Sequence, residues 1–264
     1  MRKYFFAILF LILALVFCLF CGRISLDELY NYYVNDKQTF DVIFYELRLP
    51  RLIAAGLIGA SLSISGVVFQ AIFQNPLVSP NILGVASGAG FGAIICILFS
   101  FTSLGISFGA FSGGVMAVCL AYLLGYFTNK NSKLMLVLSG IIISALFDAL
   151  ISLVKYTADT EEKLPSIVYW LMGSLSSLSW SDLGILAPVS LFGIIILICV
   201  AWKINILALS SEHAVFLGQG RMFGVVIVLL ATLITSISIC VSGIIGWVGL
   251  LIPHITRLIY GANC

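Results

Sequence analysis

The sequence predicts an all-α fold: a polytopic bundle of transmembrane helices that forms a single domain over residues 1–264. Of the 264 residues, 61% are hydrophobic and only 9% are charged, whereas a soluble domain carries about 25% charged residues. The mean hydropathy is +1.18. Apolar runs of about 20 residues, the length that crosses the hydrocarbon core as a helix, recur along the chain. These observations predict a protein embedded in membrane lipid.

Seven apolar runs and the start of an eighth are the candidate spans. The first, near full spanning length and without a small-residue cleavage site, is interpreted as an uncleaved span. Residues 166–179 are apolar but shorter and rich in serine and glycine, which favours an interfacial or re-entrant helix. The candidate spans are Tyr4–Cys21, Leu52–Phe73, Ile82–Phe101, Phe108–Phe127, Leu134–Val154, Leu183–Trp202, Phe223–Ile245 and a helix that begins near Trp247.

The distribution of basic residues predicts that the N-terminus of this multi-pass membrane protein is cytoplasmic. In that orientation the short turn from Asn129 to Lys133 is cytoplasmic and carries only basic charges. Short loops are where the positive-inside rule applies. The longer outside loops then hold most of the acidic residues.

A helix break is predicted between the second and third spans. Pro76 and Pro80 each remove an amide donor and push the preceding residue out of the α region. Gly84, Gly88 and Gly92 follow at four-residue spacing, which predicts a face that another backbone can approach closely. In lipid such a break must be buried in protein or line a water-filled cavity. A turn without a function is the alternative.

The chain offers no set of residues typical of an enzyme. It contains no G-x-x-x-x-G-K-[ST] phosphate loop, and its two histidines, His213 and His254, form no metalloprotease motif. Cys18 and Cys21 form a C-x-x-C without a second pair that would complete a metal site. No basic stripe indicates nucleic acid. We therefore expect no catalytic residue, no metal site, no cofactor and no nucleic-acid partner.

Asp148 is the only acidic residue inside a candidate span. Acids at membrane depth usually face the bundle interior or a wet cavity, so a structural contact and a functional site both remain open. The residue also supports an alternative function, a secondary transporter or channel that needs no ATPase. A membrane-embedded enzyme is a weaker alternative.

Several motifs, taken together, make the chain resemble the FecCD-type permeases. These are the membrane subunits of ABC importers for ferric siderophores, haem and cobalamin. The motifs R-L-P-R, S-G-x-x-x-Q, N-P-L and L-G-x-x-S-G-A are found here as Arg48–Arg51, Ser65-Gly66 with Gln70, Asn75-Pro76-Leu77, and Leu83-Gly84 with Ser87-Gly88-Ala89.

The resemblance implies four groups of site residues. Arg48 and Arg51 would dock an extracytoplasmic binding protein, and the break would need close packing at Asn75, Pro76, Gly84, Ser87 and Gly88. The ATPase-coupling segment would comprise Leu207, Ala208, Leu209, Glu212, Ala214, Leu217 and Gly218, with Ser211 replacing the usual glycine. A motif near the cytoplasmic end would comprise Gly249, Pro253, His254 and Arg257. His254 is interpreted as a packing histidine.

The resemblance also implies an assembly. Two permease copies, expected as a homodimer in lipid, would form the path for an iron-siderophore, haem or cobalamin-type chelate. Two separate ATPase subunits would bind ATP and magnesium, and one binding protein would deliver the chelate. The implied fold is that of type II ABC importers with ten spans. The eight spans here therefore predict a chain that lacks the last two.

Overall fold

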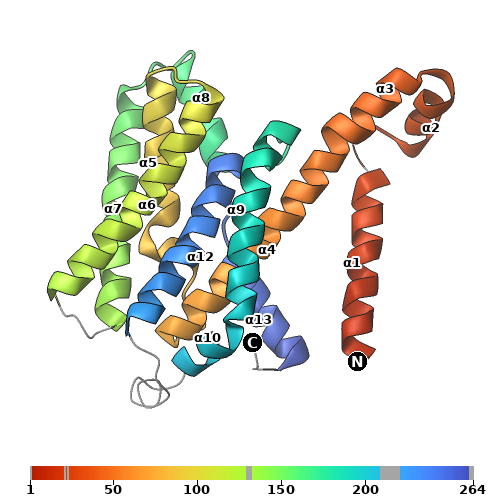
Figure 1. Ribbon diagram of the computed structural model, residues 1–264. Helices are drawn as coiled ribbons and strands as arrows, with labels where there is room; N and C mark the ends of the chain where they lie inside the picture. Colours follow the sequence, from red (N-terminus) through yellow and green to blue (C-terminus); the bar gives the residue numbers. More distant parts are fainter. Residues whose placement is uncertain (1, 21, 23, 129–132, 209–220, 262–264) are drawn as a thin grey trace. The chain divides into compact units, whose positions relative to one another are not determined.

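The computed structural model describes residues 2–20, 22, 24–128, 133–208 and 221–261, and this part of the chain is helical without strands (Figure 1). The prediction of an all-helical membrane bundle is confirmed. The elements are α1 (Arg2–Phe20), α2 (Leu26–Asn35), α3 (Lys37–Asp41), the π-helix η1 (Val42–Arg48), α4 (Leu49–Phe73), the 3₁₀ helix η2 (Pro80–Leu83), α5 (Val85–Leu98), α6 (Ser103–Thr128), α7 (Lys133–Thr157), α8 (Lys163–Met172), α9 (Trp180–Cys199), α10 (Ala201–Leu207), α12 (Arg221–Ser242) and α13 (Val248–Tyr260).

Eight apolar helices correspond to the eight candidate spans. Among the described residues, five are long and apolar enough to cross a membrane: Lys37–Phe73, Ser103–Thr128, Leu134–Thr157, Trp180–Cys199 and Met222–Ser242. Three shorter apolar helices, Phe5–Phe20, Val85–Leu98 and Val248–Tyr260, match the other candidates. The short helix expected within residues 166–179 is α8, which starts earlier and has 10 residues.

The second span is longer than the sequence predicted. Its helix begins at Lys37 and runs without a stop to Phe73, through α3, η1 and α4, whereas the predicted start was Leu52. Pro50 should have ended the helix, because its ring clashes with the carbonyl four residues earlier. The preceding π-helix removes this conflict: the amide of Leu49 donates to the carbonyl oxygen of Phe44, five residues back.

The chain forms two compact units. The smaller comprises the described residues before Ile58 together with Leu175–Ala187, and the larger comprises Ile58–Ser174 and the described residues from Pro188 onward. In the smaller unit, Ser25 and Glu28 form a capping box at the start of α2. Asp36 caps α3, and the hydrogen bond from the Thr39 hydroxyl lowers the pKa of the Asp36 carboxyl.

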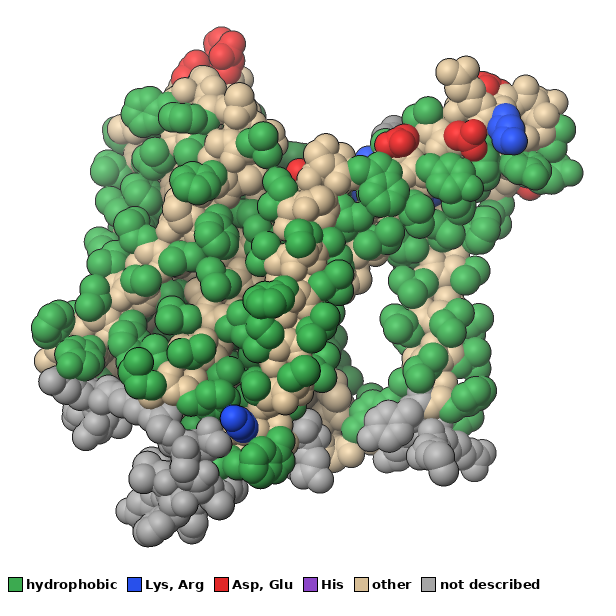
Figure 2. Space-filling view, viewed as in Figure 1, with side chains coloured by type: hydrophobic (Ala, Val, Ile, Leu, Met, Phe, Trp, Pro, Cys, Tyr) green, Lys and Arg blue, Asp and Glu red, His purple; other side chains and the backbone are tan. Residues whose placement is uncertain are grey.

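The core of the larger unit lies where α5 packs against α6 and α7, with α12 alongside α5 and α6 (Figure 1). Two buried apolar clusters hold α5, α6, α7 and α8 together. One is formed by Ile94, Ile97, Ile151, Ala158 and Ile167, and the other by Ala117, Ala121, Ile143 and Phe147. In the view of Figure 2, hydrophobic side chains cover most of the described surface. This is the surface that a lipid environment favours, because lipid tails do not penalise exposed apolar groups.

Candidate functional site

The predicted break lies between α4 and α5 and forms a compact turn. The amide of Asn75 donates to the Gln70 carbonyl oxygen at 3.2 Å, and the Asn75 side-chain oxygen accepts from the Leu77 amide at 2.9 Å. Asn75 and Pro76 are both exposed. Their role in the structure is therefore to form the turn, because the close packing occurs further along the chain.

The second half of the break is buried by α7 and α13. Val78 and Leu83 are each 1% exposed. A Cβ atom placed on Gly140 of α7 would lie 2.3 Å from the Ile82 carbonyl oxygen, and one placed on Gly249 of α13 would lie 3.0 Å from the Pro80 ring. The irregular backbone of η2 is thus enclosed by protein, as backbone that leaves the helical pattern at membrane depth must be.

Gly84 does not belong to the close-packing face that the sequence predicted. It precedes α5 as its N-cap, with a φ of 83°. This left-handed conformation favours glycine because a Cβ atom strains it. Ser87, in the first turn of α5, is half-buried. The close contact of α5 is made by Gly88 and Gly92, two residues that were predicted to lie on the same helix face.

Gly88 and Gly92 bring α5 and α6 into backbone contact. A Cβ atom on Gly88 would lie 2.4 Å from the Gly113 carbonyl oxygen, and one on Gly113 would lie 2.3 Å from the Gly88 carbonyl oxygen. A Cβ atom on Gly92 would lie 2.0 Å from the Gly109 carbonyl oxygen. The sequence interpretation missed Gly109 and Gly113, although their four-residue spacing is the same signal that drew attention to Gly88 and Gly92.

A second backbone contact joins α4 to α13. A Cβ atom on Gly66 would lie only 1.8 Å from the Gly249 carbonyl oxygen. One turn further along α4, the Gln70 amide donates to the Leu250 carbonyl oxygen at 3.4 Å. The Ser65 hydroxyl anchors the same part of α4 to α12, since it donates to the Ala231 carbonyl oxygen at 3.0 Å. Two motifs far apart in the sequence therefore meet at one crossing.

The remaining residues of the α13 motif differ in their surroundings. Pro253 is buried within the helix, whereas His254 is exposed and Arg257 is half-buried. His254 was interpreted as a packing histidine, and within this single chain its side chain is exposed. The three- or four-residue periodicity of helical faces explains the difference, because Pro253 and Gly249 are four residues apart and share the packed face.

Arg48 is held by the end of α1. Its guanidinium donates to the carbonyl oxygens of Leu19 at 2.9 Å, Phe20 at 3.0 Å and Ile24 at 3.0 Å. The last carbonyls of a helix lack intrahelical partners, and a basic side chain can satisfy them. Arg51 is half-buried, and its Nε atom is buried without a hydrogen-bond partner among the described residues.

The predicted ATPase-coupling segment begins at the end of α10. Leu207 is the last residue of that helix and Ala208 is its C-cap. Leu209, Glu212, Ala214, Leu217 and Gly218 lie outside the described residues. The ammonium of Lys203 in α10 lies 5.6 Å from the ring centre of Phe223 in α12. This cation–π contact links the two helices that flank the segment.

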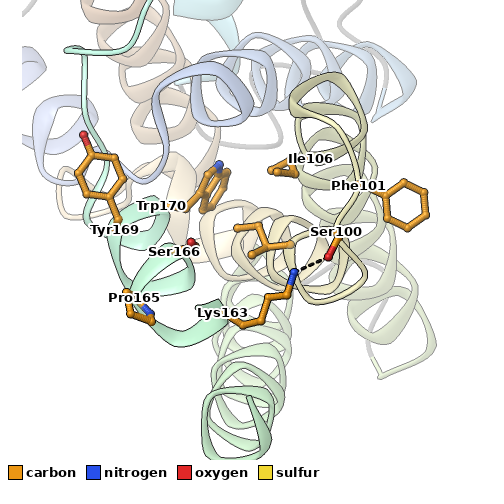
Figure 3. Close-up of a pocket in the computed structure, with 9 residues that line it drawn as sticks. Ser100, Phe101, Ile106, Lys163, Pro165, Ser166, Tyr169 and Trp170 are labelled. Carbon is orange, nitrogen blue, oxygen red and sulfur yellow. Dashed lines mark hydrogen bonds between the residues drawn. The ribbon is translucent and has the colours of Figure 1, made fainter. Parts of the chain in front are cut away.

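An open recess of about 680 Å³ lies where α5, α6 and α8 meet (Figure 3). The Lys163 ammonium donates to the Ser100 hydroxyl at its edge, as Figure 3 shows. Tyrosine and tryptophan beside an amine are typical of the membrane–water interface. None of the predicted site residues lines the recess, which is formed by Ile97, Ser100, Phe101, Ile106, Lys163, Pro165, Ser166, Tyr169 and Trp170.

Metal-binding side chains are not gathered in the described part of the chain. No group of three or more histidine, cysteine, aspartate or glutamate residues there could hold an ion. The features that this part brings together are backbone crossings.

Comparison with known proteins assigns the family. The chain is 43% identical over 223 residues to the molybdate import system permease protein MolB of Haemophilus influenzae, covering 84% of this chain and 66% of that protein. It is 40% identical over 274 residues to a probable iron chelatin transport system permease protein of Helicobacter pylori, covering 100% of this chain and 83% of that protein.

A solved structure and a family model agree with these relatives. The structure, an inward-facing conformation of a metal-chelate type ABC transporter, matches with a TM-score of 0.87 and 40% identity over 100% of this chain and 83% of that one. The family model matches residues 7–264. The chain therefore belongs to the FecCD transport family of ABC transporter permeases, as the sequence motifs predicted.

Proposed function

We propose that this chain is the permease subunit of an ABC importer that moves a metal chelate across the cytoplasmic membrane. The observation that carries the proposal is the family match over residues 7–264, and the crossing of α4 and α13 brings two of the family's motifs into backbone contact at Gly66 and Gly249. The names of two relatives support the class of cargo: besides the iron chelatin permease, the chain is 34% identical to a hemin transport system permease of Yersinia pestis.

The proposed assembly contains two copies of this chain in lipid, two ATPase subunits and one extracytoplasmic binding protein. ATP and magnesium bind to the ATPase subunits, so this chain supplies the path and not the hydrolysis. With the N-terminus in the cytoplasm, the segment after α10 faces the ATPase. ATP binding and hydrolysis then shift the populations of the outward-open and inward-open states.

The test is ATP-driven uptake in proteoliposomes. The full chain is reconstituted with a candidate ATPase subunit and a candidate binding protein from the same organism, and the uptake of labelled ferric chelate is measured with and without internal ATP. We expect uptake only with ATP, the ATPase and the binding protein together. Uptake driven by a proton or sodium gradient without the ATPase would instead identify a secondary transporter.

The coupling segment is tested by Glu212→Lys and Leu217→Asp. We expect both variants to insert normally but to lose ATP-driven uptake, because apolar side chains beside a charged one are typical of a segment that docks into a partner groove. Co-purification of the ATPase is measured alongside uptake. Ser210→Ala, in the same segment, is the control and should transport like the unchanged chain. Normal uptake by both charge-altering variants would rule out this segment as the coupling site.

The docking role of the arginines is tested by Arg51→Glu. We expect binding-protein affinity to fall about ten-fold or more at low salt, where charge attraction is least screened, and less at high salt. Arg48→Glu should weaken docking as well, and it should also lower the melting temperature because the carbonyls at the end of α1 lose their donor. The measurement is binding-protein affinity for the nanodisc-held complex across salt concentrations.

Lys37→Glu is the matched control for these arginines. Lys37 is an exposed basic residue at the start of the same continuous helix, so reversal of its charge changes the net charge equally. We expect its effect on docking to be small. If Arg51→Glu binds as tightly as Lys37→Glu at low salt, then Arg51 anchors the chain to lipid and the docking proposal is wrong.

A further inference from the structure

Asp148 places an exposed carboxylate deep within the membrane-spanning helix α7. Nine residues separate it from the helix end at Thr157, which corresponds to about 13 Å of helix, and the start of α7 lies further away on the other side. By its position along the helix, the carboxylate falls in the part of α7 that is expected to cross the hydrocarbon layer. No described residue supplies a hydrogen bond to it, although the Ser152 hydroxyl donates to the Asp148 backbone carbonyl at 2.9 Å.

The polar side chains in the second half of α7 share one face. Ser144, Asp148, Ser152 and Lys155 recur every third or fourth residue, the spacing that aligns side chains along a helix. Asp148 and Ser152 are exposed, and Ser144 and Lys155 are half-buried. We call these four residues the polar face of α7.

Two other faces of α7 are apolar. Ile143, Phe147 and Ile151 are 7%, 3% and 7% exposed, and they pack into the core of the larger unit. Ile142, Leu146 and Leu153 are 58%, 50% and 60% exposed. This exposed apolar face suits contact with lipid tails. The exposed apolar face of α7, which suits lipid, is therefore distinct from the face that carries the only acidic side chain of this helix, Asp148.

A carboxylate that faces lipid is strongly disfavoured, and ionisable residues at membrane depth instead face protein or water. The described chain does not cover Asp148. We propose that the polar face of α7 lines a water-filled path for the cargo, and that Asp148 gives this path a preference for cationic or neutral chelates over anions. The proposed preference for cationic or neutral cargo rests on the proposed function, whereas the proposed contact between the polar face of α7 and water does not.

The inference narrows the substrate class. An ionised Asp148 carboxylate would repel an oxyanion such as the one named for the molybdate permease, and it would attract a chelate that carries net positive charge. Two copies of the chain would place two Asp148 carboxylates along one path. The cargo expected here is therefore a chelated cation whose ligands do not leave it negatively charged.

The test compares neighbouring positions on the two exposed faces. Ser152→Cys and Leu153→Cys are made in a full-length chain whose native cysteines are replaced by alanine, and each is assembled with its ATPase in nanodiscs. Cationic and anionic methanethiosulfonate reagents are then applied, with rates normalised to a free thiol. We expect Ser152→Cys to react and Leu153→Cys to remain unmodified.

The charge of the path is measured in the same assay. We expect the normalised rate at Ser152→Cys to be about ten-fold higher for the cationic reagent, because a charge one helical turn away favours one sign and disfavours the other. Asp148→Asn should make the normalised rates of the two reagents equal. Asp148→Glu should preserve the preference for the cationic reagent. Labelling needs no transport, so its outcome is independent of whether uptake is driven by ATP.

Two results would overturn the inference. Protection of Ser152→Cys equal to that of Leu153→Cys would place the polar face against lipid or in a sealed protein contact. Equal normalised rates for the two reagents, with Asp148 in place, would show that the carboxylate does not set the charge of the path. The second comparison uses the native aspartate, so it decides the matter even if Asp148→Asn fails to assemble.

Discussion

Gly66→Leu is expected to yield no stable permease in the membrane. Even the first side-chain carbon would lie 1.8 Å from the Gly249 carbonyl oxygen, 2.7 Å from its carbonyl carbon and 2.9 Å from its Cα atom. These are backbone atoms, which cannot turn aside as the end of a flexible side chain can. The measurement is the yield of monodisperse protein by fluorescence-detected gel filtration after mild solubilisation.

Gly66→Ala tests the same contact with the smallest possible change. Overpacking of a well-packed site typically costs about 1–3 kcal/mol, so the melting temperature should fall clearly. Gly59→Ala is the matched control, because it lies on the same helix two turns earlier and no atom lies within 4 Å of its Cβ position. Equal stability of the two alanine variants would mean that α4 and α13 do not touch at Gly66.

The spans could be predicted because lipid imposes a simple rule on sequence. A segment that crosses the hydrocarbon must be apolar over about 20 residues and must satisfy its own backbone as a helix. The runs near Leu134 and Phe223 therefore appear as helices with little change of boundary, as Leu134–Thr157 and Met222–Ser242. The family motifs also allow the specific fold to be predicted, because several of them occur in the same order as in the family.

The departures from prediction arise from local geometry that composition does not encode. Pro50 indicates the end of a helix because proline lacks an amide donor. The π-helix that precedes it nevertheless accommodates the proline, so the helix continues. Gly84 and Gly88 are four residues apart, the spacing expected for glycines on one packing face. Gly84, however, is needed for its left-handed φ, and Gly88 for its lack of a side chain. A glycine pattern does not distinguish these two reasons.

The partners of the site residues could not be predicted because they come from distant parts of the chain. Arg48 was expected to face a binding protein, and nothing in its surroundings in the sequence indicates that it also binds the carbonyls at the end of α1. Likewise, Ser65 and Gln70 belong to a visible motif, but their acceptors lie in α12 and α13. Hydrogen bonds across more than 150 residues depend on the tertiary fold.

Gly88→Leu is the second substitution for which we expect a loss of assembly. Its Cβ position lies 2.4 Å from the Gly113 carbonyl oxygen and 2.5 Å from the Ala117 side chain, so leucine would have to push α6 away from α5. These two helices form the core of the larger unit together with α7, and their separation would open the cluster that contains Phe147. Gel-filtration yield and uptake should both be lost.

The reciprocal contact allows a sharper test through the two alanine variants. Gly88→Ala and Gly113→Ala each place a methyl group against the other residue's carbonyl oxygen, at 2.4 Å and 2.3 Å. Once one methyl group has moved the helices apart, the second meets less resistance, so the double variant should lose less stability than the sum of the single losses. Melting temperatures of all three variants, with Ser87→Ala as the neighbouring control, measure this coupling. Strict additivity of two large losses would mean that the glycines act at separate sites, and the absence of any loss would mean that α5 and α6 lie further apart than the structure places them.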